Sequence, residues 1–157
     1  MRKIIKKNID NPNKFKEKLL FWAQQFNEVI LLDSNNIENT NQLYPNFDFV
    51  LAIDAFTSIK SDTYNLFEHL KEYQKNTKDW LFGSITFDAK NDIENLKSNN
   101  EDFINFPDLF FFQPKKIFFF KNNLLEIQYL NLCEDEMEED IIEILNKEIK
   151  FTTIEKI

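Results

Sequence analysis

The spacing of apolar residues along the chain predicts three amphipathic helices. The first covers residues 12–26, because Asn11-Pro12 combines an N-cap residue with a proline at the first helical position. Its apolar residues recur at helical spacing: Phe15, Leu19, Trp22, Ala23 and Phe26. A second helix follows Ser61-Asp62 and carries Leu66, Phe67, Leu70 and Tyr73. The last begins in the acidic run 134–136, which suits a helix N-terminus, and carries Met137, Ile141, Ile144, Leu145 and Ile149.

Short apolar runs between these helices predict strands. Residues 29–32 form the first, which ends at the turn-forming residues 33–36. After a polar loop that contains Tyr44-Pro45, residues 47–54 form the second. Residues 79–88 form the third, which Gly83 interrupts, as at a bulge or a close backbone approach.

The second half of the chain adds an extended segment and a hairpin. The polar pattern of residues 89–105 predicts a helical turn and a loop. Residues 106–114 are predicted to form an extended apolar segment between two prolines. Residues 116–120 and 124–130 flank Lys121-Asn122-Asn123, which predicts a hairpin with a three-residue loop. Tight hairpins and alternating strands favour an α+β fold, with a mainly antiparallel sheet packed against helices. The 157 residues suit a single domain, residues 1–157.

Composition excludes several classes of site. A single glycine rules out a glycine-rich phosphate loop and a dinucleotide-binding motif. One cysteine, Cys133, and one histidine, His69, cannot make a Cys/His zinc site, and no disulfide can close within the chain. No apolar run approaches the roughly 20 residues that a membrane-spanning helix needs.

The net charge of the chain excludes further classes of partner. The chain has 19 basic and 27 acidic residues, a formal net charge of −8, and such a surface repels a phosphate backbone. We therefore expect no nucleic-acid partner and no membrane partner. The basic N-terminus lacks the apolar region and cleavage site of a signal peptide, which indicates a cytoplasmic protein.

The titratable residues do not make a self-sufficient active site, and we expect no catalytic residue in this chain. His69 lies within a predicted helix without a positioned serine, and acidic neighbours raise the pKa of the Cys133 thiol and oppose its use as a nucleophile. Three aspartates end apolar strands: Asp33, Asp54 and Asp88. Two of them could bind Mg²⁺ through hard oxygen ligands, but the same residues are ordinary turn and cap residues, and the second interpretation is favoured.

Three segments, in this order, resemble the start of one enzyme family. Val29-Ile30-Leu31-Leu32-Asp33-Ser34 is similar to its "LLES"-type motif, and Gly83-Ser84-Ile85-Thr86-Phe87-Asp88 to its "GYLSYD"-type strand. Residues 106–117 resemble its "PDLYFF-P" segment. The family is that of anthranilate synthase component I and aminodeoxychorismate synthase component I. Residues 79–82 and 90–94 look most like the aminodeoxychorismate (para-aminobenzoate) branch.

This resemblance implies that the chain is the N-terminal domain of a longer component I. The chorismate-binding catalytic region, with its Mg²⁺ site, would lie C-terminal to residues 1–157 and is absent here; the chain itself would hold no cofactor. The parent enzyme would be a transferase of folate biosynthesis that aminates chorismate with ammonia from a glutamine amidotransferase subunit. The expected partners are therefore the catalytic half, that amidotransferase and L-tryptophan.

The resemblance also implies a ligand site at Asp33 and Ser34. In the family, an acidic side chain at this motif pairs with the ammonium of a bound tryptophan, and a hydroxyl holds its polar end. Asp33 is one methylene shorter than the usual glutamate, and a simple strand-to-turn cap is an equal alternative. Two other functions stay open: the N-terminal domain of anthranilate synthase component I, and a free-standing ligand-sensing or interaction module.

Overall fold

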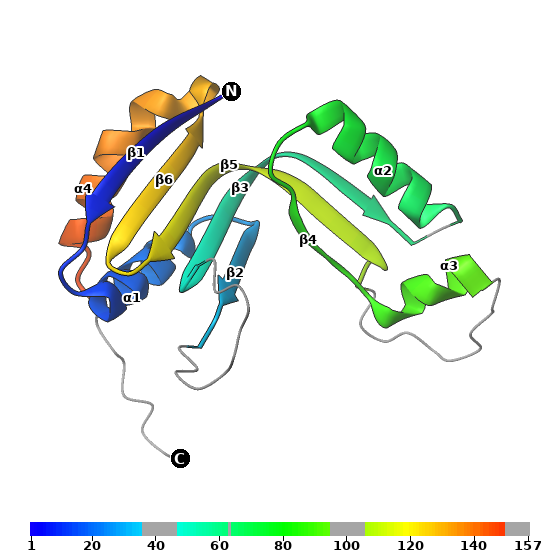
Figure 1. Ribbon diagram of the computed structural model, residues 1–157, viewed down its shortest axis with the longest axis horizontal. Helices are drawn as coiled ribbons and strands as arrows, with labels where there is room; N and C mark the ends of the chain where they lie inside the picture. The colour runs from blue at the N-terminus through cyan, green and yellow to red at the C-terminus, as the bar shows by residue number, and fades with distance from the viewer. Residues whose placement is uncertain (36–46, 63, 95–105, 150–157) are drawn as a thin grey trace, which may run out of the picture. The chain divides into compact units, whose positions relative to one another are not determined.

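A computed structural model describes residues 1–35, 47–62, 64–94 and 106–149 (Figure 1). In this part of the chain, a six-stranded antiparallel sheet packs against four α-helices, which confirms the expected α+β class. The strands are β1 (Arg2–Asn8), β2 (Val29–Asp33), β3 (Phe49–Ser61), β4 (Phe82–Ile85), β5 (Leu109–Lys121) and β6 (Leu124–Leu130). The helices are α1 (Pro12–Ala23), α2 (Leu66–Thr77), α3 (Lys90–Glu94) and α4 (Met137–Asn146), with 3-10 helices η1 (Phe87–Ala89) and η2 (Asn131–Glu136).

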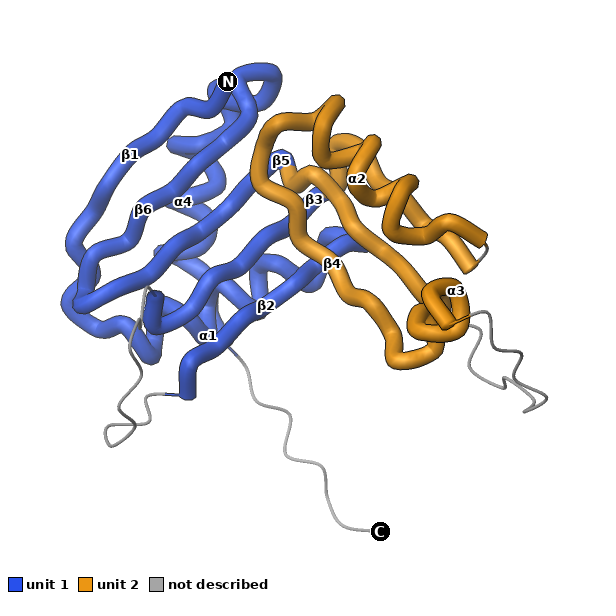
Figure 2. The backbone as a smooth tube through the Cα atoms, turned by 45° about the vertical axis from the view of Figure 1, so that its right-hand side comes forward, with its two compact units in different colours: residues 1–54, 115–157 blue, residues 55–114 orange. Residues whose placement is uncertain are grey.

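The strand order is β1-β6-β5-β3-β2, and β4 also pairs with β5. The chain divides into two compact units (Figure 2). Unit 1 contains Met1–Asp54 and Lys115–Ile157, and unit 2 contains Ala55–Pro114. The chain therefore passes from one unit to the other twice, within the two longest strands, β3 and β5.

In unit 1, helices α1 and α4 cover the same face of the sheet (Figure 1). Alternate strand residues point to this face and form one core cluster with the helices. From the helices the cluster takes Phe15, Leu19, Trp22, Met137, Ile141 and Ile144; from the strands it takes Phe49, Leu51, Ile53, Phe118, Phe120, Leu125, Ile127 and Tyr129. Burial of these aromatic and branched side chains is the main source of stability of unit 1.

In unit 2, helix α2 packs through Leu66 and Leu70 on a small cluster that includes Ala89 and Leu109. The N-terminus of α2 is capped by a residue that lies far away in the sequence. The Asp92 carboxylate accepts hydrogen bonds from the backbone N–H groups of Asn65 (2.8 Å) and Leu66 (2.9 Å). Two of the first free N–H groups of the helix are satisfied in this way. The local Ser61-Asp62 signal thus lies a few residues before the true start of the helix.

The first helix starts where its sequence signals predict but ends three residues before the predicted end at Phe26. It begins at Pro12 and ends at Ala23, and the Asn11 side chain caps it by accepting the Lys14 N–H at 3.1 Å. The exposed His69 lies on helix α2, as expected. The acidic run 134–136 forms the end of η2, directly before α4. Tyr44-Pro45 and most of the loop predicted before residue 105 lie outside the described residues.

Several strand predictions were wrong in their bounds. The two pieces predicted at 106–114 and 116–120 form one continuous strand, β5, with Pro114 inside it. Strand β3 extends to Ser61, whereas β4 is limited to four residues. The hairpin loop has two residues, Asn122 and Asn123, because Lys121 already pairs with Leu124. Both have positive φ, 48° and 65°, as the tight turn with the right-handed strand twist requires.

Strand β1 is an element that the pattern of apolar residues does not predict. It pairs with β6 along its whole length, from Arg2 opposite Leu130 to Asn8 opposite Leu124. Its few apolar residues include the adjacent Ile4 and Ile5, which do not alternate as in an isolated amphipathic strand. Only the partner strand makes this segment extended.

Candidate functional site

Asp33 is the last residue of β2 and lies opposite Phe49 of β3. Its side chain is held by two groups of the chain itself. Lys16, from helix α1, forms an ion pair with one carboxylate oxygen, and the backbone N–H of Asn35 donates to the other at 2.9 Å. The ammonium of a ligand that bound Asp33 would therefore have to share or displace Lys16.

Ser34 forms hydrogen bonds with Asp48, which directly precedes strand β3. Its hydroxyl donates to the carbonyl oxygen of Asp48 at 2.9 Å, and its backbone N–H donates to the same oxygen at 3.0 Å. Asp48 is itself fixed, since its carboxylate accepts the Asn122 N–H at 2.8 Å. Both residues of the expected tryptophan site thus form a well-bonded strand end, and their role as a ligand site stays a prediction.

Sequence reasoning missed Lys16 as part of this site. It lies two residues after Lys14, on the charged side of the first helix, and nothing local marks it as a partner of Asp33. Its ammonium also lies 5.7 Å from the centre of the Phe49 ring. The ion pair joins α1 to the far end of the next element, β2, across 17 residues of sequence.

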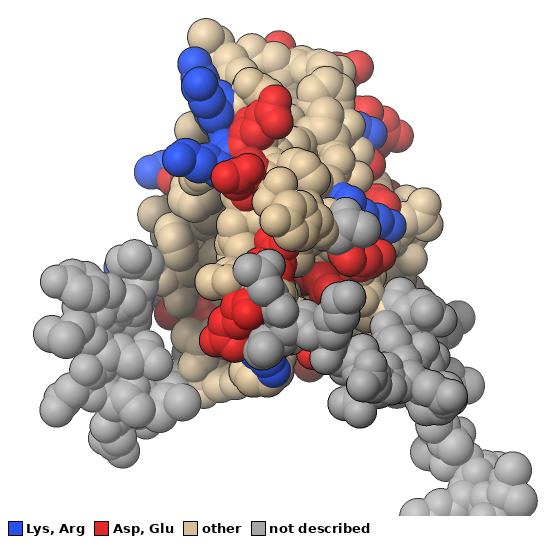
Figure 3. Space-filling model, turned by 90° about the vertical axis from the view of Figure 1, so that its right-hand side faces the viewer, with Lys and Arg blue, Asp and Glu red and all other residues tan. Residues whose placement is uncertain are grey.

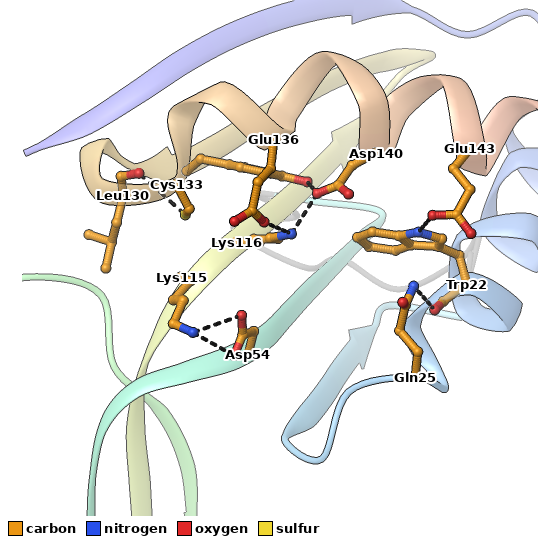
Figure 4. A network of polar contacts seen from close by, with 11 residues as sticks. Trp22, Gln25, Asp54, Lys115, Lys116, Leu130, Cys133, Glu136, Asp140 and Glu143 are labelled. Atoms are coloured by element: carbon orange, nitrogen blue, oxygen red, sulfur yellow. Dashed lines mark hydrogen bonds and ion pairs between the residues drawn. The ribbon is translucent and has the colours of Figure 1, made fainter.

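A second polar cluster lies under helix α4, around Lys116 of β5 (Figure 4). The Lys116 side chain is 3% exposed, and its ammonium lies 2.6 Å from Asp140 Oδ2 and 2.7 Å from Glu136 Oε2. Tyr129 Oη donates to the same Asp140 oxygen at 2.7 Å. The ammonium also lies 5.1–5.6 Å from the ring centres of Tyr129, Phe26 and Trp22, where cation–π attraction adds to the ion pairs.

The charge states in this cluster oppose catalysis. Burial lowers the pKa of Lys116, but the hydrogen bonds that its ammonium donates to Asp140 and Glu136 outweigh this effect, so the pKa is raised above its ordinary value of 10.5. A lysine nucleophile needs the neutral amine, which this environment disfavours. Burial and the neighbouring Asp140 also raise the pKa of Tyr129. The cluster therefore serves to fix α4 on the sheet.

Cys133 lies at the edge of this cluster, and its thiol is buried. It donates to the carbonyl oxygen of Leu130 at 3.4 Å. Burial raises the pKa of the Cys133 thiol, and the carboxylate of Glu136 raises it further. A thiol in this state is a poor nucleophile, as the acidic sequence around it indicates.

Of the three aspartates predicted at strand ends, only Asp33 ends a strand, whereas Asp54 lies inside β3 and Asp88 lies in η1. They do not form one cation site. Asp33 and Asp54 lie at opposite ends of the β2–β3 ladder, about 16 Å apart along β3 at the usual rise per residue. Asp54 binds Lys115 at 3.1 Å, and Asp33 binds Lys16. Asp88 belongs to unit 2. Across the ranges that the structure describes, no group of three or more His, Cys, Asp or Glu side chains is placed to hold a metal ion.

Unit 2 has a small acidic hollow of about 200 Å³, which Asp62, Asp88, Asp92 and Asp108 line together with Tyr64 and Asn91. Three of these aspartates have structural partners. Asp92 caps α2, Asp62 accepts the Asp108 N–H at 2.8 Å, and Asp108 accepts the Thr86 hydroxyl at 2.7 Å. Acidic side chains also gather over the face seen in Figure 3, in line with the net charge of −8.

Comparison with models of known protein families finds no match to this chain, and comparison with curated protein sequences finds none either. Among the described helices, none is long and apolar enough to cross a membrane.

Proposed function

We propose that this chain is the N-terminal domain of an aminodeoxychorismate synthase component I, and that it supplies a scaffold and a tryptophan pocket rather than catalytic groups. The observation that carries the proposal is the ordered set of three family-like segments. They fall on β2 with the turn after it, on β4 with η1, and on β5, all within an antiparallel α+β fold. The proposal includes a cytoplasmic location.

The sheet of unit 1 supports a scaffold role, because its two faces differ. Helices α1 and α4 pack on one face only. The residues that alternate with the core positions are also apolar: Ile30, Leu32, Val50, Ala52, Ile117 and Phe119. Leu32 on edge strand β2 is 55% exposed, and Ile4 on edge strand β1 is 50% exposed. Val50, Ala52, Ile117 and Phe119 on this face are already buried within the chain, so the apolar surface left for a further layer lies at the edge strands, at Leu32 and Ile4. The proposal assigns that layer to the catalytic half.

The chemistry of the parent enzyme would belong to its other parts. In this proposal the C-terminal half binds chorismate and Mg²⁺, and an amidotransferase subunit releases ammonia from glutamine. In the described part of the chain, every buried side-chain nitrogen and oxygen atom has a hydrogen-bond partner. The product would be 4-amino-4-deoxychorismate; the anthranilate branch would differ only in the chemistry after amination.

The first test is to read the source gene beyond the codon for Ile157 and to assay the protein that it encodes. We expect a reading frame of a few hundred further residues, and formation of 4-amino-4-deoxychorismate from chorismate, ammonium and Mg²⁺ by the whole protein. A stop codon at that point, or a full-length protein that does not consume chorismate, overturns the proposal and leaves a free-standing binding module. Formation of anthranilate instead transfers the chain to the other branch.

The second test concerns the pocket at Asp33 and Ser34. Isothermal titration of the full-length protein with L-tryptophan is expected to give saturable binding to one site. Ser34→Ala should weaken this binding about tenfold, since one hydrogen bond to a charged ligand group is lost. Ser84→Ala, an exposed serine of unit 2, is the matched control and should leave binding unchanged. Equal affinities of the two variants would remove Ser34 from the pocket.

A further inference from the structure

Strand β2 is the last strand at one end of the sheet order, so one of its long edges has no partner strand among the described residues (Figure 1). Its other edge pairs with β3. At the two ends of this ladder, the Ser34 N–H donates to the Asp48 carbonyl at 3.0 Å, and the Asp54 N–H donates to the Glu28 carbonyl at 3.1 Å.

These two hydrogen bonds show which backbone groups of β2 face away from β3. Both involve even-numbered residues of the β2 segment, and residues of an antiparallel strand alternate in the side to which their N–H and C=O groups point. The odd-numbered residues therefore direct their backbone groups to the free edge. They are Val29, Leu31 and Asp33.

The two terminal strands of the sheet differ in charge. Strand β1, at the other end of the order, carries Arg2, Lys3, Lys6 and Lys7, and lysines on an edge strand oppose pairing with another chain. The only charged side chain of β2 is Asp33, which already forms an ion pair with Lys16. Two copies of β2 can therefore approach one another without the like-charge repulsion that two copies of β1 would meet.

Strand β2 also lacks the other features that protect the edge of a sheet. It contains no proline, and it pairs with β3 without a bulge from Val29 to Asp33. Its side chains are apolar on both faces, with Val29 38% exposed and Leu32 55% exposed. An unprotected apolar edge of this kind is where a further strand adds to a sheet.

The three outward residues are spaced symmetrically about Leu31, which favours a second copy of β2 as the added strand. In an antiparallel pair with its two-fold axis at Leu31, this residue lies opposite its own equivalent, and Val29 lies opposite Asp33 of the second copy. Every outward N–H and C=O group of the three residues then has a partner. Ile30 lies opposite Leu32 of the second copy, which covers the exposed leucine.

We propose that the free edge of β2 binds a second copy of this chain, and that the two sheets join across an antiparallel β2–β2 contact. Both copies use the same surface, so the contact closes at the dimer. The contact has five residues a side, against about 20–30 in a stable interface, and we expect a weak dimer with a dissociation constant on the order of 0.1–1 mM. The proposal rests on the backbone edge of β2 and is independent of the proposed function.

Sedimentation equilibrium of the 157-residue chain tests the dimer, at concentrations from roughly 20 µM to roughly 1 mM. We expect the mean mass to rise with concentration toward that of a dimer and no further. A mass that stays monomeric up to the highest concentration overturns the proposal. A mass that exceeds that of a dimer also overturns it, because a closed contact cannot produce larger assemblies.

A proline substitution separates edge pairing from general apolar association. The Val29 N–H points outward, so Val29→Pro removes one donor of the dimer from each copy and leaves the ladder with β3 intact. Loss of two hydrogen bonds should weaken the dimer roughly tenfold. The indole NMR signal of the buried Trp22, which donates to Glu143 Oε2 at 2.9 Å, reports that unit 1 stays folded.

Ile4→Pro on strand β1 is the matched control. The Ile9 N–H donates to the Asn123 carbonyl at 2.8 Å, so the odd-numbered residues of this segment face β6, and the Ile4 N–H points outward as that of Val29 does. Ile4 is also exposed, at 50%. Ile4→Pro should leave the dissociation constant unchanged. An equal effect of the two proline substitutions, whether large or absent, overturns the proposal.

Cysteine substitutions test the register. Opposite Cα atoms of a hydrogen-bonded pair lie about 5.5 Å apart, within reach of a disulfide, so Leu31→Cys should form a covalent dimer under mild oxidation. Val29→Cys should not, because the two copies of position 29 would lie about 13 Å apart along the strands. The unmodified chain, with its buried Cys133, gives the background. No covalent dimer of Leu31→Cys above this background, or equal yields from the two variants, overturns the proposed pairing.

Discussion

Lys116 Nζ lies 2.6 Å from Asp140 Oδ2, and this contact joins the middle of strand β5 to helix α4 across 24 residues of sequence. The lysine is on the core face of the strand, on the same side as Phe118 and Phe120. A charge at this position is tolerated because Asp140 and Glu136 both contact it. Without such partners, burial of an ammonium group is strongly unfavourable.

Lys116→Met should therefore lower the free energy of unfolding by about 3 kcal/mol, because it leaves Asp140 without its cation under the helix. Urea unfolding, followed by the fluorescence of Trp22, measures this loss. Lys147→Met is the control, since Lys147 and Glu143 form a partly exposed pair 3.2 Å apart and its loss should cost at most about 0.5 kcal/mol. Similar losses for both variants would contradict a structural role of the buried cluster.

Stability should fall in acid through Glu143. Its pKa lies below the ordinary 4.5, first because its carboxylate accepts the Trp22 indole N–H and then because Lys147 hydrogen-bonds to it. The folded chain thus holds the charged form more tightly than the unfolded chain does. This contribution is present above pH 4.5 and is lost as the pH falls through the lowered pKa of the folded state.

Glu143→Gln should make the stability less dependent on pH between about pH 6 and about pH 3, since the amide does not titrate in this range. Urea midpoints at several pH values measure the slope. Glu139→Gln, on the exposed side of the same helix, is the control and should keep the slope of the unmodified chain. A slope that Glu143→Gln leaves unchanged would show that the Trp22–Glu143 contact is not linked to folding.

Gly83 is required by a close approach of backbone rather than by its conformation. A Cβ atom at this position would lie 2.0 Å from the Phe110 carbonyl oxygen and 2.6 Å from Phe111 Cα, both of the paired strand β5. Backbone cannot yield as a side chain can, so we expect Gly83→Ala to destabilise unit 2 by about 3 kcal/mol. The Trp80 indole NMR signal during urea unfolding is the measurement, with Ser84→Ala as the control. An unchanged midpoint for Gly83→Ala would mean that β4 can shift away from β5.

The exposed apolar edge at Leu32 should promote self-association of the isolated chain. Light scattering at increasing protein concentration is expected to show a rising mean mass, and Leu32→Glu should reduce this rise. Val29→Glu tests the other face of the same strand, where Val29 is 38% exposed, and should have a smaller effect. A strictly monomeric profile of the unmodified chain at high concentration would contradict the prediction.

The sequence was sufficient to predict an element where the residues that stabilise it are close neighbours in the chain. Asn11-Pro12 starts α1 because both the cap and the fixed proline φ act within a few residues. The apolar stripes of α1, α2 and α4 and the hairpin at Asn122-Asn123 are likewise encoded nearby. For the same reason the absence of a dinucleotide motif or a zinc site follows from composition alone.

Pairing between distant strands decided what local patterns did not predict. Pro114 looks like a strand boundary because it has no N–H to donate. Within β5, however, the pairing with β4 ends at Phe112 and the pairing with β6 starts at Lys116, so Pro114 lies between the two ladders. Strand β1 is extended for a similar reason: β6 supplies the backbone partners that its own few apolar residues cannot.

The sequence by itself determined the fold class, the three longer helices and the excluded sites, because capping, periodicity and residue counts depend on neighbours in the chain. Tertiary structure alone decided the partners of the charged groups. Lys16 meets Asp33, Lys116 meets Asp140, and Asp92 caps α2, each across 17 to 26 residues. The local sequence around an aspartate does not show whether it has such a partner, because charge pairing depends on distance in space and not on position in the chain.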